Sequence, residues 1–124
     1  THSDMAIAQQ EIFGPVLAVL DFSTFDEAIA IANGVDYGLA GSVWTNDLRT
    51  AVRAAHALRC GDVWVNDHLP LGSETPHGGC KRSGFGKDLG ADSLADFTVG
   101  KNVYIDLTGQ ARKSWHYTTY GDPP

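Results

Sequence analysis

Residues 42–66 read SVWTNDLRTAVRAAHALRCGDVWVN, and this stretch decides the fold. Its two ends, 42–45 and 62–66, are rich in β-branched and aromatic residues, which favour strands. Between them, Asp47 can cap a helix and Gly61 can end it. The apolar residues of that helix fall on one stripe: Leu48, Val52, Ala55 and Leu58. A strand, a helix and a second strand at this spacing predict a right-handed βαβ unit with parallel strands.

The residues before this stretch predict a second unit of the same kind. Residues 15–22 (PVLAVLDF) form an apolar run typical of a strand that is buried on both faces of a parallel sheet. A capping box follows: Thr24 can accept from the backbone N–H of Glu27, and Glu27 can reach back to the N–H of Thr24. We expect a helix over 25–32 that ends at Asn33-Gly34 with a left-handed glycine. The predicted fold class is therefore α/β, a βαβαβ arrangement with parallel strands.

After residue 66 the sequence no longer alternates between predicted strands and helices. Residues 69–90 form a long glycine-rich loop, and a loop of this length inside a compact domain is often functional. Residues 92–97 predict a short helix, and 102–107 (NVYIDL) predict a last strand. From residue 108 to 124 the sequence is polar and aromatic, and we expect a flexible tail.

Composition excludes several classes of function. The 124 residues carry a net charge of −6 with a pI of about 5.1, which argues against a nucleic-acid partner or an anionic membrane surface. No apolar run approaches the ~20 residues of a membrane span. Cys60 and Cys80 make no disulfide framework, so we expect reduced thiols in a cytoplasmic protein. The chain begins at Thr1 without an initiator methionine, which we interpret as a processed start or as part of a longer chain.

Two glycine patterns look like phosphate loops and fail on inspection. Residues 84–90 (GFGKDLG) are one residue longer than the dinucleotide fingerprint and do not lie between a strand and a helix. Residues 79–84 have the glycine spacing of a P-loop, but Phe85 stands where the phosphate-binding lysine must be. Neither pattern predicts nucleotide binding.

Cysteine and histidine patterns are equally weak. His77 lies three residues before Cys80, and such a pair could make a thiolate nucleophile, yet nothing marks an oxyanion hole. A cysteine hydrolase that uses Cys80 and His77 is kept as an alternative. The candidate metal ligands match no known spacing, and we predict no metal site. These candidates are Asp67, His68, Glu74 and His77.

Glu11 and Phe13 suggest a binding role more strongly. Glu11 precedes a chain reversal that leads into the apolar run of residues 15–22. A carboxylate beside an aromatic ring at a strand end can hold a ribose diol while the ring covers a flat heterocycle. An exposed acidic residue in a turn is the alternative at this point.

Five motifs taken together resemble one family. They stand in order along the chain: EIFGPV at 11–16, YGLAGSVWT at 37–45, GDVWVN at 61–66, PHGGCKRSGFGKDLG at 76–90 and DFTVGKNVYI at 96–105. The series closely resembles the C-terminal part of the aldehyde dehydrogenase superfamily, from residue 4 to 107. The resemblance implies oxidation of an aldehyde to an acid with NAD or NADP as cofactor.

The resemblance also implies roles for particular residues. Glu11 matches the glutamate that binds the nicotinamide ribose, and Phe13 matches the aromatic residue beside the nicotinamide. Leu71 and His77 fall where the family lines its substrate tunnel. Residues 73–79 are closest to the γ-aminobutyraldehyde branch, where a loop acid such as Glu74 could bind an aminoaldehyde's ammonium group.

The chain divides into three expected parts. By the resemblance, residues 1–100 correspond to the C-terminal part of the catalytic domain and 101–107 to an oligomerisation strand. Residues 108–124 have no counterpart in the family, and their sequence predicts a flexible tail. An edge strand is a ready template for pairing with another chain, so we expect a homo-oligomer.

The resemblance carries no catalytic residue into this chain. The family's catalytic cysteine, general-base glutamate and oxyanion asparagine, with most of the nucleotide-binding domain, correspond to sequence upstream of this segment. Cys60 and Cys80 do not align with the nucleophile. We therefore expect the 124-residue piece to be inactive and to bind no cofactor by itself. The alternative is a non-catalytic assembly module that uses an exposed strand and sheet face.

Overall fold

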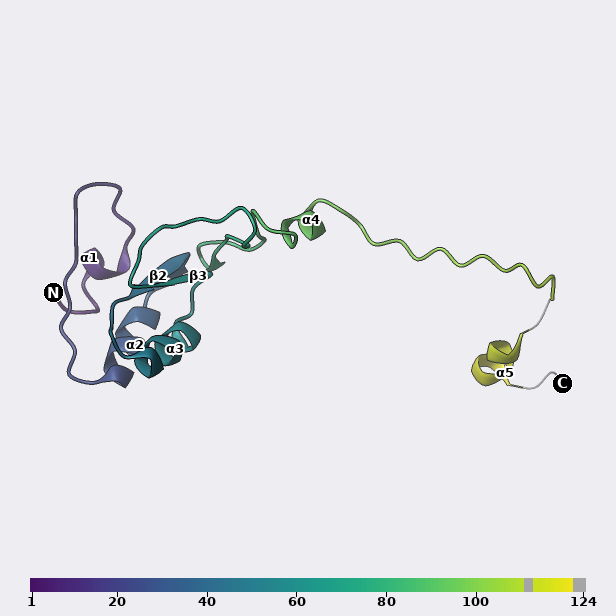
Figure 1. Ribbon diagram of the computed structural model, residues 1–124, viewed down its shortest axis with the longest axis horizontal. Helices are drawn as coiled ribbons and strands as arrows, with labels where there is room; N and C mark the ends of the chain where they lie inside the picture. The colour runs from purple at the N-terminus through teal and green to yellow at the C-terminus, as the bar shows by residue number, and fades with distance from the viewer. Residues whose placement is uncertain (111–112, 122–124) are drawn as a thin grey trace.

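The computed structural model describes residues 1–110 and 113–121 of the chain (Figure 1). Short helices and strands alternate along most of it, and the C-terminal part extends away from them. The elements in chain order are α1 (Ala6–Gln9), α2 (Phe25–Asn33), β1 (Tyr37–Gly38), β2 (Ala40–Val43), α3 (Leu48–Ala57), β3 (Asp62–Val65), β4 (Cys80–Lys81), α4 (Ser93–Asp96) and α5 (Ser114–Tyr120).

The predicted βαβ unit at the centre of the chain is confirmed. β2 and β3 pair in parallel, with Ser42 opposite Trp64, and α3 connects them. Asp47 caps α3 as expected, because its carboxylate accepts the backbone N–H groups of Arg49 and Thr50. The α/β class follows from this unit.

The strand expected over residues 15–22 is wrong for the chain as described. This segment pairs with no other described strand, and the Leu17 side chain is 85 % exposed. The parallel sheet therefore has two strands, not three. An apolar run shows a preference for burial and extension, but a strand also needs a neighbour that accepts its hydrogen bonds. Residues 18–22 instead border an apolar hollow of about 580 Å³ against α2 and β2.

Both ends of α2 depart in detail from the expectation. Thr24 accepts the N–H of Glu27 at 3.2 Å, but the Glu27 carboxylate accepts from Ser23 at 2.7 Å instead of from Thr24. Gly34 has φ −75°, so it is not left-handed. A residue far away in the sequence binds the carbonyls at the C-terminal end of α2. The Lys81 ammonium group donates to the carbonyls of Asn33 and Val35, each at 3.0 Å.

The glycine-rich loop is anchored to the sheet region. β4 pairs with β1 in antiparallel fashion, with Tyr37 opposite Lys81. Gly61 lies so close to the loop that a Cβ on it would stand 1.7 Å from the Gly78 carbonyl oxygen. In β4, Lys81 takes a positive φ of 56°. The loop is therefore in direct contact with β1 and with the start of β3.

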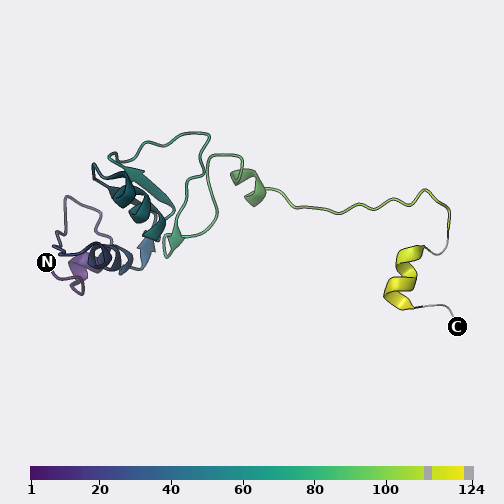
Figure 2. The same ribbon diagram turned by 60° about the horizontal axis from the view of Figure 1, so that its bottom comes forward.

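The C-terminal part runs as an extended chain away from the other elements (Figures 1 and 2). Residues 102–107, the expected last strand, pair with no other described segment of this chain, and their pairing with a second chain stays a prediction. The expected flexible tail contains α5, and Lys113 just before this helix pairs with Asp106 and lies 5.6 Å from the Tyr104 ring. The rest of the tail expectation, at 111–112 and 122–124, lies outside the described residues.

The described residues bury little apolar surface. Ala51 and Ala54, both on α3, are the two buried hydrophobic residues of the described part, and each is 4 % exposed. Many large apolar side chains, including Phe13, Trp44 and Phe97, are exposed. None of the helices in residues 1–110 and 113–121 has the length and apolar character needed to cross a membrane.

Candidate functional site

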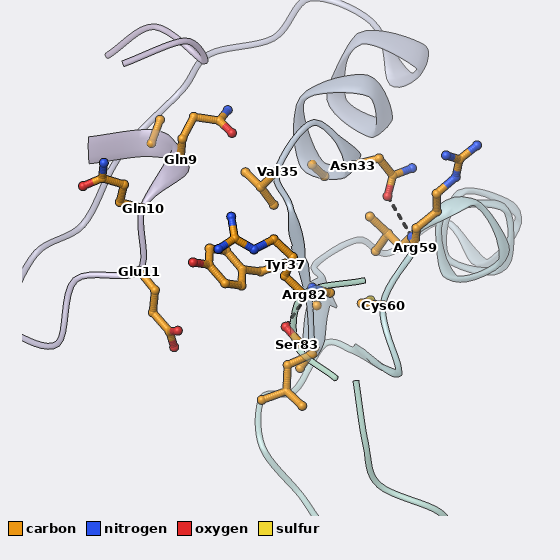
Figure 3. A pocket seen from close by; sticks show the side chains of 17 residues that line it. Gln9, Gln10, Glu11, Asn33, Val35, Tyr37, Arg59, Cys60, Arg82 and Ser83 are labelled. Atoms are coloured by element: carbon orange, nitrogen blue, oxygen red, sulfur yellow. Dashed lines mark hydrogen bonds between the residues drawn. The ribbon is translucent and has the colours of Figure 1, made fainter. Parts of the chain in front are cut away.

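Glu11 lies at the edge of a hollow of about 610 Å³. Figure 3 shows it on the side formed by residues 9–11, across from Tyr37 and Arg82. Its side chain is exposed, and its carboxylate makes no hydrogen bond or ion pair within the described residues. The hollow is lined by Ala8, Gln9, Gln10, Glu11, Ala32, Asn33, Val35, Tyr37, Gly38, Leu39, Ala40, Gly41, Leu58, Arg59, Cys60, Arg82 and Ser83.

Phe13 does not line this hollow and is 95 % exposed. The structure therefore does not bring Phe13 and Glu11 to one enclosed site. Both side chains are accessible to a ligand, and their roles beside a nicotinamide ribose stay predictions.

The wall of the hollow opposite Glu11 is fixed by polar contacts. The Arg82 guanidinium pairs with Asp36 at 3.3 Å and lies 5.8 Å from the centre of the Tyr37 ring. The Ser83 hydroxyl accepts the backbone N–H of Gly38 at 3.0 Å. These contacts join the residues after β4 to β1, so this wall is a defined surface.

Cys60 and Cys80 are half-buried thiols with carbonyl partners. The Cys80 thiol donates to the carbonyls of Gly38 and Arg59, at 3.4 and 3.2 Å. Burial raises the pKa of the Cys60 thiol, and the neighbouring Cys80 and Asp62 raise it further. A thiol with a raised pKa is a poor nucleophile near neutral pH, which argues against Cys60. A hydrolase built on Cys80 and His77 is not favoured either, because the Cys80 thiol donates to backbone carbonyls and His77 Nδ1 lies against Asp62.

The residues expected to line a substrate tunnel lie in the glycine-rich loop. Leu71 and Glu74 are exposed, while His77 is half-buried. The turn that carries Glu74 is closed by Thr75, whose hydroxyl and N–H both donate to the Gly72 carbonyl. The loop thus holds two accessible side chains and one enclosed imidazole, and their role in a tunnel stays a prediction.

The enclosed imidazole has a partner that the sequence analysis missed. His77 Nδ1 lies 2.8 Å from Oδ2 of Asp62, the first residue of β3. The missed signal is a charged residue at the start of an otherwise apolar strand, DVWV. His77 and Cys80 therefore have different hydrogen-bond partners: His77 contacts Asp62, and Cys80 donates to the Arg59 carbonyl.

His68 and Trp64 fix the start of the loop. The Trp64 indole N–H donates to the Pro70 carbonyl at 2.9 Å, and His68 Nδ1 lies 2.9 Å from the Ser42 hydroxyl. His68 and His77 therefore bind separate partners. In the parts of the chain that the structure describes, no three His, Cys, Asp or Glu side chains converge as a metal site would require.

A parallel βαβ unit with long loops around it defines an α/β protein. The aldehyde dehydrogenase family matches residues 1–103. The chain belongs to this family, which confirms the resemblance found in the motifs.

Individual relatives support the same assignment. The chain is 47 % identical over 92 % of its length to a betaine aldehyde dehydrogenase of Bacillus subtilis, and 46 % identical over 85 % to an aldehyde dehydrogenase of Emericella nidulans. It spans 23 % and 21 % of these relatives, respectively. The γ-aminobutyraldehyde branch stays a proposal, because these relatives carry other names.

Solved structures agree with the fold. An apo betaine aldehyde dehydrogenase from Staphylococcus aureus superimposes with a TM-score of 0.86 at 42 % identity, over 89 % of this chain and 22 % of that one. An NAD+ complex of an aldehyde dehydrogenase from Bacillus cereus superimposes with a TM-score of 0.84 at 41 % identity, over 87 % and 22 %. The α/β class and its local geometry are thus those of the family.

Proposed function

We propose that this chain is the C-terminal part of the catalytic region of an NAD-dependent aldehyde dehydrogenase, which oxidises an aldehyde to a carboxylic acid. The observation that carries the proposal is the family match over residues 1–103. Relatives solved as NAD+ complexes support NAD as the cofactor. The free thiols of Cys60 and Cys80 support a reducing compartment such as the cytoplasm.

Glu11 and Phe13 are the residues that we assign to the cofactor. Bound NAD would supply the hydride acceptor for the oxidation. The Glu11 carboxylate fits a ribose diol, since the residue is exposed and its carboxylate has no partner in the described structure. Phe13 offers an exposed ring for the flat nicotinamide.

The 124 residues alone should not turn over an aldehyde. Cys60 is protonated near neutral pH, and Cys80 and His77 have other partners, so the described residues offer no activated nucleophile. The test is NADH formation by the purified chain with NAD and an aldehyde. Turnover by this chain would contradict the assignment, whereas turnover only by a longer form of the protein would support it.

We assign a positively charged aldehyde as the substrate, with an aminoaldehyde as the main candidate. Glu74 is exposed in the loop that holds His77, and a carboxylate there can attract a substrate cation. The betaine aldehyde named for several relatives also carries a positive nitrogen. Charge is therefore the feature that these substrates share.

Glu74→Gln tests this assignment in the active enzyme. Because the carboxylate is exposed, we expect KM for an aminoaldehyde to rise only about 2- to 5-fold, with kcat unchanged. A neutral aliphatic aldehyde of the same length is the matched control and should show no change. An equal rise for both substrates would remove the charge assignment.

Residues 101–107 are assigned to subunit association within the enzyme. They are extended and unpaired, and Val103, Ile105 and Leu107 are exposed. A purely non-catalytic assembly module is not favoured, since the family match covers residues 1–103.

A further inference from the structure

Asp62 and His77 form an enclosed contact at the point where the loop meets the sheet. Their side chains are 15 % and 26 % exposed, and Asp62 Oδ2 lies 2.8 Å from His77 Nδ1. The Arg82–Asp36 pair nearby is far more exposed. A hydrogen bond of this length in a shielded setting holds a ring in one orientation more firmly than an exposed pair does.

The backbone fixes both partners of this contact. Asp62 begins β3, and its N–H donates to the Leu39 carbonyl at 3.1 Å. His77 exchanges two backbone hydrogen bonds with Asp88, at 2.6 and 2.7 Å. The geometry of the pair therefore does not depend on a mobile loop.

The residue after His77 is clamped as well. The Gly78 carbonyl accepts the Lys87 ammonium group at 2.5 Å, and it lies directly against Gly61. Moving Asp62 or His77 apart would break the backbone hydrogen bonds of Asp62 with Leu39 or of His77 with Asp88.

The contact distinguishes the two nitrogens of the imidazole. An ionised carboxylate only accepts hydrogen bonds, so the nitrogen facing Asp62 must carry the proton. Nε2 has no hydrogen-bond partner among residues 1–110 and 113–121. In the neutral ring, Nε2 is then an unprotonated acceptor on a partly exposed side chain.

We infer that Asp62 is a positioning residue: it holds His77 with Nδ1 protonated, so that Nε2 accepts a hydrogen bond from substrate aldehydes that carry an N–H or O–H donor. This inference rests on the proposed aldehyde dehydrogenase function. Two features of the substrate are thereby recognised by different residues: Glu74 attracts a positive charge, and His77 accepts a hydrogen bond from an N–H or O–H group. A primary aminoaldehyde carries both features, whereas a trimethylammonium aldehyde carries only the charge.

The first test is spectroscopic and needs no enzymatic activity. Long-range proton–nitrogen NMR of the 124-residue chain, above the pH at which histidine titrates, reports which ring nitrogen holds the proton. We expect His77 to be the Nδ1–H tautomer, in contrast to the exposed His56 in the same spectrum. An Nε2–H tautomer at His77, or a mixture like that of His56, would overturn the positioning role.

Variants sharpen the spectroscopic test. Asp62→Leu removes the acceptor and should release His77 to the mixture seen for His56. Asp62→Glu should restore Nδ1–H in part, and Asp36→Asn, which removes an exposed carboxylate from the same region, should change nothing at His77. If Asp62→Leu does not fold, as its amide spectrum would show, the wild-type tautomer and Asp62→Glu still decide the question.

The second test concerns substrates, in the longer active enzyme. For Asp62→Leu we expect KM for γ-aminobutyraldehyde to rise about 10-fold, the loss of one hydrogen bond, and KM for a trimethylammonium aldehyde to change less than about 2-fold. Equal loss on both substrates would overturn the acceptor role. If the wild-type enzyme oxidises no aldehyde, the proposed function fails, and with it the substrate assignment, while the tautomer measurement still decides whether Asp62 positions His77.

Discussion

At the scale of single residues, Asn33 couples the two main helices. Its amide N–H donates to the Ala57 carbonyl at 2.9 Å, and its amide oxygen accepts the Arg59 N–H at 2.7 Å. One side chain therefore satisfies two backbone groups at the end of α3 from the end of α2.

Asn33→Asp should uncouple these helix ends. The carboxylate can still accept from Arg59, but it turns an oxygen towards the Ala57 carbonyl, so we expect a loss of about 1–3 kcal/mol of local stability. Amide hydrogen exchange at Arg59 measures it. Asn46→Asp is the matched control, since Asn46 is exposed and its side chain has no partner in the described residues. Equal protection of Arg59 in both variants would contradict the coupling.

Asp106 gives a prediction that depends on pH. The hydrogen bond from Lys113, with those from the Thr108 N–H and hydroxyl, lowers the pKa of Asp106 from 3.8 to about 2. A lowered pKa favours the folded contact above pH 3.8, and the contribution is lost as the pH falls through about 2. Carboxyl NMR of Asp106 should therefore give a midpoint near 2.

Lys113→Met tests the cause of that shift. The midpoint of Asp106 should move up towards 3.8 without reaching it, because the contacts from Thr108 remain. Lys101→Met removes an equal charge from the same extended segment and should leave the midpoint in place. A wild-type midpoint near 3.8 would show that Lys113 does not hold Asp106 in solution.

At the scale of elements, local signals were predictable and distant partners were not. The caps Thr24 and Asp47 depend on neighbours within three residues, so the sequence located both helices. The predicted strand at 15–22 was wrong because the residues of a segment do not show whether a neighbouring strand is available to pair with it. α2 ends at Gly34 as expected, but the lysine that donates to the Asn33 carbonyl lies 48 positions away in the sequence, so the local pattern could not predict it.

The candidate site follows the same rule. Glu11 and His77 were found through motifs, because their positions within those motifs are local features. Asp62 was missed because it lies 15 positions from His77, and only the docking of the loop on β3 brings the two together. The sequence therefore predicted a role for His77 but not for its partner Asp62.

Gly61→Ala tests how the loop docks on β3. A Cβ there would meet the Gly78 carbonyl oxygen at 1.7 Å and its carbon at 2.7 Å, both rigid backbone atoms. The loop must move away, at a cost of at least ~1–3 kcal/mol, and should separate His77 from Asp62. Loss of the Nδ1–H tautomer of His77 measures this. Gly100→Ala is the control, because nothing lies within 4 Å of its added Cβ. An unchanged His77 in Gly61→Ala would refute the docking.

At the scale of the whole molecule, the chain is an elongated body with little core. Ala51 and Ala54 are small, so the described residues gain little from burial, while large apolar side chains remain in contact with solvent. A solution state that covers some of this surface is favoured. The extended segment offers the most regular surface, since Val103, Ile105 and Leu107 alternate along it.

The alternation of side chains along residues 103–107 determines which face of this segment is open to a second copy of the chain. In an extended chain, residues 103, 105 and 107 share one face, and Tyr104 and Asp106 share the other. The second face is engaged, because Lys113 contacts both of its residues. The first face is apolar and open, with Leu107 90 % exposed. A second copy of the chain can cover this face while also supplying backbone partners for residues 101–107.

Sedimentation velocity of the 124-residue chain should therefore show species heavier than 13.3 kDa that increase with concentration. Ile105→Lys places a charge at the centre of the open face and should weaken this association by about 10-fold or more, because a buried unpaired charge is costly. Leu48→Lys is the control, since it changes an equally exposed leucine on α3 and leaves the segment intact. If Leu48→Lys weakens association as much as Ile105→Lys, the contact is general apolar clustering. If the wild-type chain stays monomeric at all concentrations, residues 101–107 do not join copies of this chain.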